Sequence, residues 1–293
     1  MAIYCSIDGN TLTSGHSIDA LINDRGLAYG HGLFETILFS NGKLPLLSKH
    51  VKRICRDAPK VGISIQSEHI HNCLEQFVDH LSANSVYSGV VKIILTAGTG
   101  GRGYATPETL KPSVICTFSD LPRDLSQQRQ WGIAVRCCHY KLPINPPLAG
   151  IKHLNRLDQI IARAEWRNPD YSEGLIFSTE DMLVEAISAN VFLKQASGDW
   201  LTPDISVAGV SGVMRSLLLE EVSSDCGIEV KVSNISKEQL SASEELFVCN
   251  SIRGIVPVTA IYSSNEDLIK TLPIGKDTQI LQTVLNTKYT EYL

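Results

Sequence analysis

The sequence predicts a two-domain protein that mixes α-helices and β-strands, in the α+β or α/β class. Its 293 residues are nearly twice the length of a typical domain. Strand-like runs of β-branched residues are interspersed with helix-like stretches. The segment 120–130 is polar, contains Pro122 and lacks an apolar stripe, which is typical of a linker. We therefore expect a smaller domain over 1–119 and a larger one over 131–293.

The smaller domain is expected to begin with two β-hairpins. Asp8-Gly9-Asn10 and Asn41-Gly42 each lie between apolar-rich runs, and such turns favour hairpins. The second hairpin would pair residues 33–39 with residues 43–46.

A helix and two strands should complete this domain. Ser48 is a candidate N-cap for a helix that runs to about Val61 and ends at Gly62. The runs 89–96 and 113–119 are rich in β-branched residues and predict strands.

The larger domain is expected to contain a strand over 131–138, several strands over 173–201, and helices over 155–166, over 211–226 and at the end of the chain. The helix over 155–166 should have one apolar face. That face consists of Leu157, Ile160, Ile161 and Ala164.

Composition and charge exclude several classes of protein. Apolar residues make up 43% of the chain, which is typical of a globular protein. The net charge is −5, without a basic block that could bind a nucleic acid backbone. We see neither a signal peptide nor an apolar run long enough to span a membrane. The eight cysteines form no CxxC pair. We expect a cytoplasmic protein that binds neither nucleic acid nor membrane.

Residues 98–103 match the dinucleotide-binding pattern GxGxxG after a predicted strand. Only nine residues separate Gly103 from the next strand, whereas a βαβ crossover needs about a dozen or more. A flexible substrate loop in which Arg102 supplies charge is therefore favoured over a dinucleotide site.

Two other motifs match known signatures only in part. His69 and His71 could bind a metal, but no neighbouring residues complete a site, and solvated histidines on a helix are favoured. Residues 209–213 read GVSGV, whereas a serine hydrolase elbow needs a final glycine. Ser211 and Gly212 could instead bind an anion at a helix start or act as an ordinary cap.

Lys152 and Glu185 are charged residues among apolar neighbours. Desolvation lowers the pKa of an ammonium group, so Lys152 could act as an amine nucleophile that forms a Schiff base; a surface lysine is the alternative. A buried Glu185 needs a cationic or protonated partner. Asn190 follows in the same stretch, and both residues could also occupy the exposed face of a strand.

These residues together resemble the fold-type IV PLP enzymes, the group of branched-chain and D-amino-acid aminotransferases, and within it most closely the 4-amino-4-deoxychorismate lyases. The resemblance spans residues 7–258. It depends on seven segments: DRGLAYGHGLFET (24–36), HVKR (50–53), GRGY (101–104), LAGIKHLNRL (148–157), EAISANVF (185–192), GVSGVMR (209–215) and CNS (249–251).

The resemblance implies a two-domain enzyme with pyridoxal 5′-phosphate (PLP) in the interdomain cleft. Lys152 would hold PLP as a Schiff base and later move protons, and Thr36 would help to deliver a proton to the departing enolpyruvyl group. Glu185 would pair with the pyridine nitrogen. The implied cofactor-binding residues are Arg53, Lys152, Glu185, Asn190, Ser211, Gly212 and Ser251, and the implied substrate-binding residues are His31, Arg102 and Tyr104.

The implied reaction converts 4-amino-4-deoxychorismate, a small molecule, to 4-aminobenzoate and pyruvate in folate synthesis. Glu35 stands where aminotransferases commonly have glutamate, so a D-amino-acid or branched-chain aminotransferase is the main alternative. A non-catalytic relative that binds an anionic metabolite is a second alternative. The resemblance also implies a homodimer.

Overall fold

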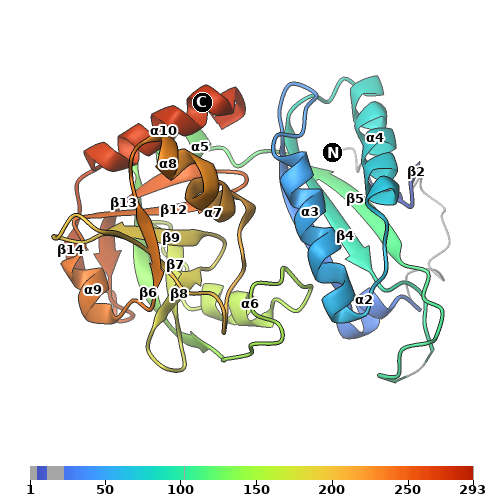
Figure 1. The fold of residues 1–293 in the computed structure, drawn as a ribbon, viewed down its shortest axis with the longest axis horizontal. Helices are drawn as coiled ribbons and strands as arrows, with labels where there is room; N and C mark the ends of the chain where they lie inside the picture. The colour runs from blue at the N-terminus through green and yellow to red at the C-terminus, as the bar shows by residue number, and fades with distance from the viewer. Residues whose placement is uncertain (1–4, 12–22, 102, 293) are drawn as a thin grey trace. The chain divides into compact units, whose positions relative to one another are not determined.

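The computed structural model describes residues 5–11, 23–101 and 103–292. They belong to two compact units (Figure 1). The first unit comprises residues 1–121 and 152–155, and the second comprises residues 122–151 and 156–293. Residues 152–155 were expected in the larger domain, but they pair with an edge strand of the first unit, because a strand edge offers unpaired backbone groups.

The first unit is built on a five-stranded antiparallel sheet in the order β2-β1-β5-β4-β3. The hairpin at Asp8–Asn10 is confirmed, and two strands have the predicted bounds. Helices α3 and α4 cover one face of this sheet (Figure 1). The elements are β1 (Cys5–Ile7), β2 (Asn10–Thr11), α2 (Arg25–Tyr29), β3 (Gly32–Phe39), α3 (Leu47–Asp57), the 3-10 helix η1 (Ala58–Val61), α4 (Ser67–Ala83), β4 (Gly89–Thr96) and β5 (Ser113–Ser119).

The predicted second hairpin is wrong. Strand β3 pairs along its whole length with β4, and its approach to the following segment is limited to a bridge between Ser40 and Lys43. Pro45 has no N–H with which to extend a ladder. Leu46 adopts a left-handed conformation with φ of 59°, so the chain turns directly into α3.

The helix predicted from Ser48 forms, but Ser48 is not its N-cap. The N-cap is Leu46, which makes no side-chain capping bond. At the other end, α3 tightens into η1 and the chain turns at Gly62, with φ of 73°. Glycine adopts this left-handed conformation without a steric penalty, which explains why the predicted end was right.

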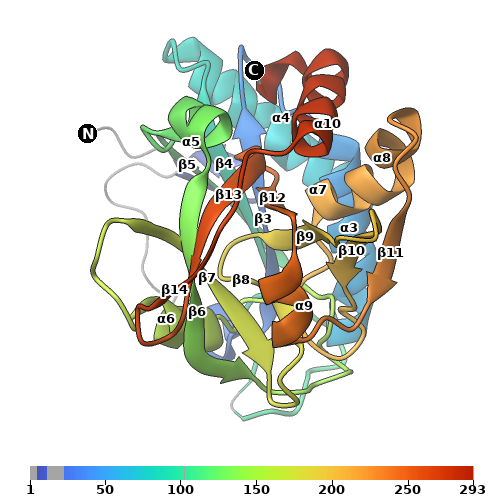
Figure 2. The same ribbon diagram turned by 90° about the vertical axis from the view of Figure 1, so that its left-hand side faces the viewer.

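The second unit is built on a mixed nine-stranded sheet. The order is β11-β10-β9-β12-β13-β6-β7-β8, and β14 pairs with β13. Figure 2 shows β13, β6 and β7 side by side. The strands are β6 (Ile133–Leu142), β7 (Tyr171–Ser178), β8 (Leu183–Ala186), β9 (Asn190–Lys194), β10 (Trp200–Pro203), β11 (Val230–Ser233), β12 (Glu245–Asn250), β13 (Gly254–Tyr262) and β14 (Leu268–Thr271).

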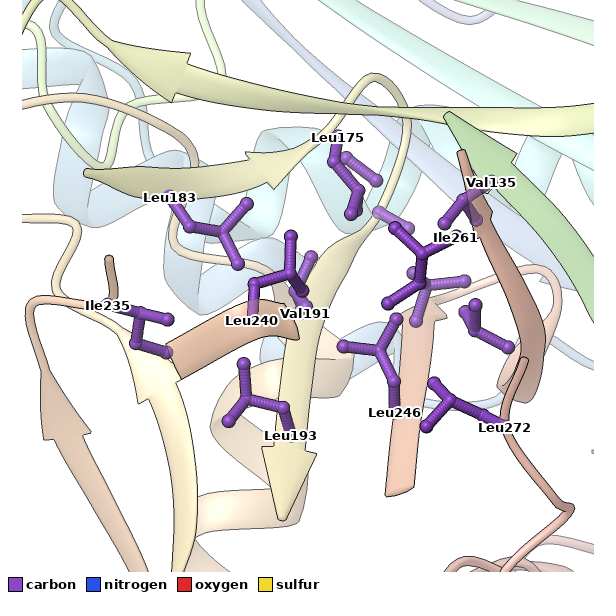
Figure 3. Close-up of a cluster of buried hydrophobic side chains, with 14 of the residues drawn as sticks. Val135, Leu175, Leu183, Val191, Leu193, Ile235, Leu240, Leu246, Ile261 and Leu272 are labelled. Atoms are coloured by element: carbon purple, nitrogen blue, oxygen red, sulfur yellow. The ribbon is translucent and has the colours of Figure 1, made fainter. Parts of the chain in front are cut away.

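The main core of the second unit lies on one face of this sheet. Leu175, Val191 and Leu246 project from three strands toward Leu240 of a short helix (Figure 3). Burial of such aliphatic side chains contributes about 1.5–3 kcal/mol each, so this cluster anchors the strands that carry the site.

Five stretches of helix surround the sheet of the second unit, apart from short terminal turns. They are α5 (Leu125–Trp131), α6 (Leu157–Arg163), the continuous helix α7 (Val213–Leu217), η2 (Leu218–Val222) and α8 (Ser223–Asp225), α9 (Lys237–Ala242) and α10 (Lys276–Lys288). Helix α5 lies in the segment that was expected to be a linker. A single apolar side chain, Leu125, anchors it, which is too little to produce a periodic pattern.

The apolar face of the helix predicted at 155–166 is exposed. Helix α6 is shorter than predicted, and Leu157, Ile160 and Ile161 are 70%, 61% and 50% exposed. Ala162, which follows Ile161, is buried instead. The apolar pattern of a sequence shows which residues share a hydrophobic helix face. It does not show whether other parts of the same chain cover that face.

Across the ranges that the structure describes, no helix combines the length and apolar character needed to cross a membrane. In the same ranges, no group of three His, Cys, Asp or Glu side chains is arranged to hold a metal ion. All eight cysteines are free.

Candidate active site

Lys152 is held against the edge strand of the first unit. The Phe34 N–H donates to the Lys152 carbonyl at 3.0 Å, and the Leu154 N–H donates to the Gly32 carbonyl at 3.0 Å. Leu33 and His153 form the antiparallel bridge between these bonds. Lys152 is therefore directly opposite Phe34, and its Nζ lies 4.3 Å from the centre of the Phe34 ring.

Thr36 lies on the same face of β3 as Phe34. Side chains alternate along a strand, and here the half-buried Phe34 and Thr36 alternate with the buried Leu33, Glu35 and Ile37. Diagonal neighbours on one face of a sheet are about 7–8 Å apart. Lys152, opposite Phe34, and Thr36 thus lie on the same face of the edge of this sheet.

The opposite face of β3 carries a buried charged cluster. The Glu35 carboxylate accepts hydrogen bonds from Arg53 Nε at 2.8 Å and Nη2 at 2.5 Å. It also binds His50 Nδ1 at 2.6 Å. Burial raises the pKa of Glu35, but the Arg53 charge and the His50 hydrogen bond outweigh it and lower the pKa to about 2. Glu35 is therefore ionised and pairs with Arg53.

His50 is neutral in this cluster. Burial lowers its pKa more than the hydrogen bond to Glu35 raises it, and the charges of Arg53 and Lys152 lower it further. Its Nδ1–H must therefore donate to Glu35. The other nitrogen, Nε2, is buried and has no hydrogen-bond partner among the described residues. A buried acceptor of this kind calls for a water molecule or a ligand donor.

His31 does not present a nitrogen for a substrate. Its Nε2 donates to the Val61 carbonyl at 2.6 Å, because a carbonyl can only accept. Its Nδ1 accepts from Arg25 Nε at 3.2 Å. In this structure His31 joins the Val61 carbonyl to the Arg25 side chain, and the substrate contact expected of it stays a prediction.

Arg25 organises the loop after β4, and sequence reasoning missed it. Its guanidinium donates to the carbonyls of Gly101, Gly103 and Tyr104 at 3.1–3.3 Å. Tyr104 itself is 88% exposed and contacts Tyr29 edge to face. The Tyr104 side chain lies at the surface, and its expected contact with the substrate stays a prediction. Arg102 lies outside the described residues.

In the second unit, the peptides between Gly209 and Ser211 in the loop at 209–212 are fixed by hydrogen bonds. The Val210 N–H donates to Glu185 at 2.8 Å, and the Val210 carbonyl accepts from Asn190 Nδ2 at 2.9 Å. The Gly150 N–H donates to the Gly209 carbonyl at 2.9 Å, and the Ser211 N–H donates to the Gly150 carbonyl at 3.0 Å. The Ser211 amide was expected to bind phosphate, but Gly150 already engages it.

Two glycines make this packing possible. At Gly212 a Cβ atom would lie 1.9 Å from Asn190 Oδ1, and at Gly209, where φ is +91°, it would lie 2.7 Å from Val184 and 3.3 Å from Glu185 Oε2. Any side chain at either position would displace Asn190 or the strand that carries Glu185.

Glu185 is buried, with 4% of its surface exposed, and it interacts electrostatically with Arg156. Burial lowers the pKa of Arg156, and the charge of Glu185 partly restores it, so the two groups stabilise each other's charged forms. The partner that a buried Glu185 was expected to need therefore includes Arg156 as well as the Val210 amide.

The comparisons with known proteins agree on one family. The family model described as amino-transferase class IV matches residues 32–261. The aminodeoxychorismate lyase of Vibrio harveyi is 32% identical, over 91% of this chain and 95% of the lyase. The crystal structure of 4-amino-4-deoxychorismate lyase from Pseudomonas aeruginosa is 34% identical, with a TM-score of 0.86 over 97% of this chain and 99% of that one. The D-alanine aminotransferase of Bacillus licheniformis is 22% identical, over 82% of each chain.

Proposed function

Because this chain belongs to the class IV aminotransferase family, we propose that it is an aminodeoxychorismate lyase, which converts 4-amino-4-deoxychorismate to 4-aminobenzoate and pyruvate. The observation that carries this proposal is the pairing of Lys152 opposite Phe34 of β3, on the face of the strand that also carries Thr36. An amine and a hydroxyl on the same face could supply the base and the acid that such an elimination needs. The identity to two lyases, 32% and 34%, exceeds the 22% identity to the D-alanine aminotransferase.

The cofactor is pyridoxal 5′-phosphate, and the donor set fits it. The first unit offers a primary amine in Lys152, a fixed guanidinium in Arg53 and the unpartnered His50 Nε2. The second offers a buried carboxylate in Glu185 and the rigid loop at 209–212. When bound, PLP supplies an electron sink for the carbon that carries the substrate amine.

The protein's own groups would move the protons. Lys152 would hold the cofactor through its primary amine, and the same amine, when free, would remove the proton from the amine-bearing carbon of the substrate. Thr36 would donate a proton to the three-carbon group that leaves as pyruvate, and the remaining ring would become aromatic. Glu185 would hold the pyridine nitrogen in its protonated form, since a nearby carboxylate favours the cationic form of a base.

We assign the phosphate to Arg53, Ser211, Gly212 and Ser251. Glu35 fixes the guanidinium plane of Arg53 in advance, which reduces the conformational entropy lost on binding. The Ser211 amide is engaged by Gly150, so the Ser211 side chain is assigned to the phosphate in its place. Asn190 acts through the loop, because it binds the Val210 carbonyl.

Transamination is the alternative, and Glu35 does not favour it. The Glu35 side chain lies on the face of β3 away from Phe34 and Thr36, where Arg53 and His50 bind it. Its identity therefore supports the cluster with Arg53 in either kind of enzyme and does not discriminate between the two reactions.

We also propose a homodimer that works in the cytoplasm. The exposed apolar residues of α6, Leu157, Ile160 and Ile161, form the kind of patch that marks a protein interface. Eight free cysteines are typical of a reducing compartment. Light scattering of the wild type and of Ile160→Asp tests the interface: a dimer that becomes a monomer supports it, and an unchanged mass contradicts it.

The decisive experiment supplies the purified enzyme with 4-amino-4-deoxychorismate and measures 4-aminobenzoate and pyruvate. Equimolar products support the lyase. A parallel assay offers D-alanine or leucine with a keto-acid acceptor. Rapid transamination without 4-aminobenzoate would establish the aminotransferase instead.

A further inference from the structure

The turn that carries Ser251 is a three-residue connection between β12 and β13, where Asn250 pairs with Gly254. The Asn250 side chain satisfies the amides inside the turn. Its Oδ1 accepts from the Ile252 N–H at 3.0 Å and the Arg253 N–H at 2.7 Å. Its Nδ2 donates to the Ser188 carbonyl at 3.0 Å. The three carbonyls of the turn need donors from elsewhere.

Two residues distant in the sequence supply those donors. Tyr292 Oη, at the C-terminal end of the chain, donates to the Ser251 carbonyl at 2.8 Å. Arg129 of α5 donates to the Ile252 carbonyl from Nη2 at 3.1 Å and to the Arg253 carbonyl from Nε at 2.8 Å. All three carbonyls of the turn are therefore bound by Tyr292 and Arg129.

These two residues also hold each other. Arg129 Nη1 donates to the Tyr292 carbonyl at 2.9 Å, and the guanidinium carbon lies 5.7 Å from the centre of the Tyr292 ring. The ring packs on the turn as well, since a Cβ atom at Gly254 would lie 3.1 Å from it. Tyr292 is 1% exposed. Burial raises the pKa of its hydroxyl, so it remains a donor at any physiological pH.

We propose that Tyr292, supported by Arg129, is a positioning residue for Ser251 and thereby sets the affinity of the protein for the phosphate group of PLP. This inference rests on the proposed function, because it takes Ser251 as a phosphate ligand. A hydrogen bond to phosphate depends on the donor position, and the position of Ser251 depends on its own carbonyl, which Tyr292 holds. Tyr292, which lies outside every cofactor-binding motif, would thus contribute to the cofactor site through Ser251.

The test compares PLP with pyridoxal, the same aldehyde without the phosphate, as ligands of the apoenzyme. Tyr292→Phe keeps the buried ring and removes the donor. Loss of one hydrogen bond should weaken PLP binding about three- to tenfold and leave pyridoxal binding unchanged. Both affinities are measured by absorbance titration, and thermal unfolding of the apoenzyme reports stability separately. A purely structural role would lower stability or weaken both ligands equally.

Tyr87→Phe is the matched control. The Tyr87 hydroxyl is exposed and donates to the backbone carbonyl of Ser82 at 3.4 Å in the first unit. Its loss should alter neither affinity.

A double-variant cycle tests whether Tyr292 acts through Ser251. In a Ser251→Ala background, Tyr292→Phe should weaken PLP binding by less than about twofold, because coupled residues are not additive. Independent effects that multiply, or a Tyr292→Phe protein that binds PLP like the wild type, would overturn the inference alone. A wild type that binds no PLP would overturn the proposed function and this inference with it.

Discussion

Glu35 and Arg53 form a buried bidentate pair in which the carboxylate accepts from Nε at 2.8 Å and from Nη2 at 2.5 Å. The pair joins β3 to α3 across the buried face of the strand. It places a guanidinium, with His50 beside it, directly behind the strand that carries Phe34 and Thr36. Strand β3 therefore carries both this buried ion pair and residues of the candidate site.

The first prediction concerns acid stability. Glu35→Gln should lower the free energy of unfolding at pH 7 by about 3 kcal/mol, because it leaves the buried Arg53 without its counter-charge. The pKa of Glu35 is lowered from 4.5 to about 2 by folding. Its contribution is thus fully present above pH 4.5 and is lost as the pH falls toward 2.

Urea unfolding of the wild type and the variant at several pH values checks this prediction. The difference between them should shrink below pH 4.5. Glu75→Gln, an exposed change on α4, should leave the free energy of unfolding at pH 7 nearly unchanged. A constant gap from pH 7 to pH 3 would show that Glu35 acts by packing alone.

The second prediction identifies the lysine that binds the cofactor. Two lysines approach the Phe34 ring, Lys152 at 4.3 Å and Lys92 at 5.0 Å. Lys152→Ala should abolish the visible absorption of the bound cofactor, because only a primary amine forms the covalent link. Lys92→Ala should keep it. After borohydride reduction, PLP should be found on the peptide that contains residue 152, and recovery on the peptide with residue 92 would reverse the assignment.

The third prediction concerns Thr36 as the proton donor. Thr36→Val keeps the shape of the side chain and removes its hydroxyl. If that hydroxyl is the general acid, formation of 4-aminobenzoate should fall about 10²- to 10⁴-fold. PLP affinity should be nearly unchanged, because the proposed phosphate and ring contacts lie on other residues. Full activity in this variant would assign the proton to another group.

The fourth prediction concerns the loop at 209–212. Gly212→Ala should destabilise the protein by about 1–3 kcal/mol, the usual range for overpacking, because the new Cβ atom would lie 1.9 Å from Asn190 Oδ1. In an Asn190→Ala background, which opens that space, the same change should be much less destabilising. Gly101→Ala is the control, because the new Cβ atom would have no atom within 4 Å, and this change should be neutral. Gly198→Ala is unsuitable, because the φ angle of Gly198 is +90°. Additive effects at 190 and 212 would contradict the contact.

Local signals in the sequence were sufficient for the elements that depend on local chemistry. Residues 89–96 and 113–119 form strands with the predicted bounds, because β-branched runs favour extended backbone wherever they pack. Gly62 ends η1, which follows α3, because glycine accepts the left-handed conformation there. The roles expected of Lys152, Thr36 and Glu185 stay predictions.

Only the tertiary structure decided which distant groups meet. It paired β3 with β4 rather than with residues 43–46, and it left the apolar side of α6 exposed. It also assigned Arg25 to the carbonyls of one loop and Tyr292 to the Ser251 carbonyl. A strand edge, a carbonyl or a buried carboxylate accepts any suitable donor, so its partner depends on which part of the chain is packed beside it. That choice is made by long-range packing, which leaves no periodic trace in the sequence.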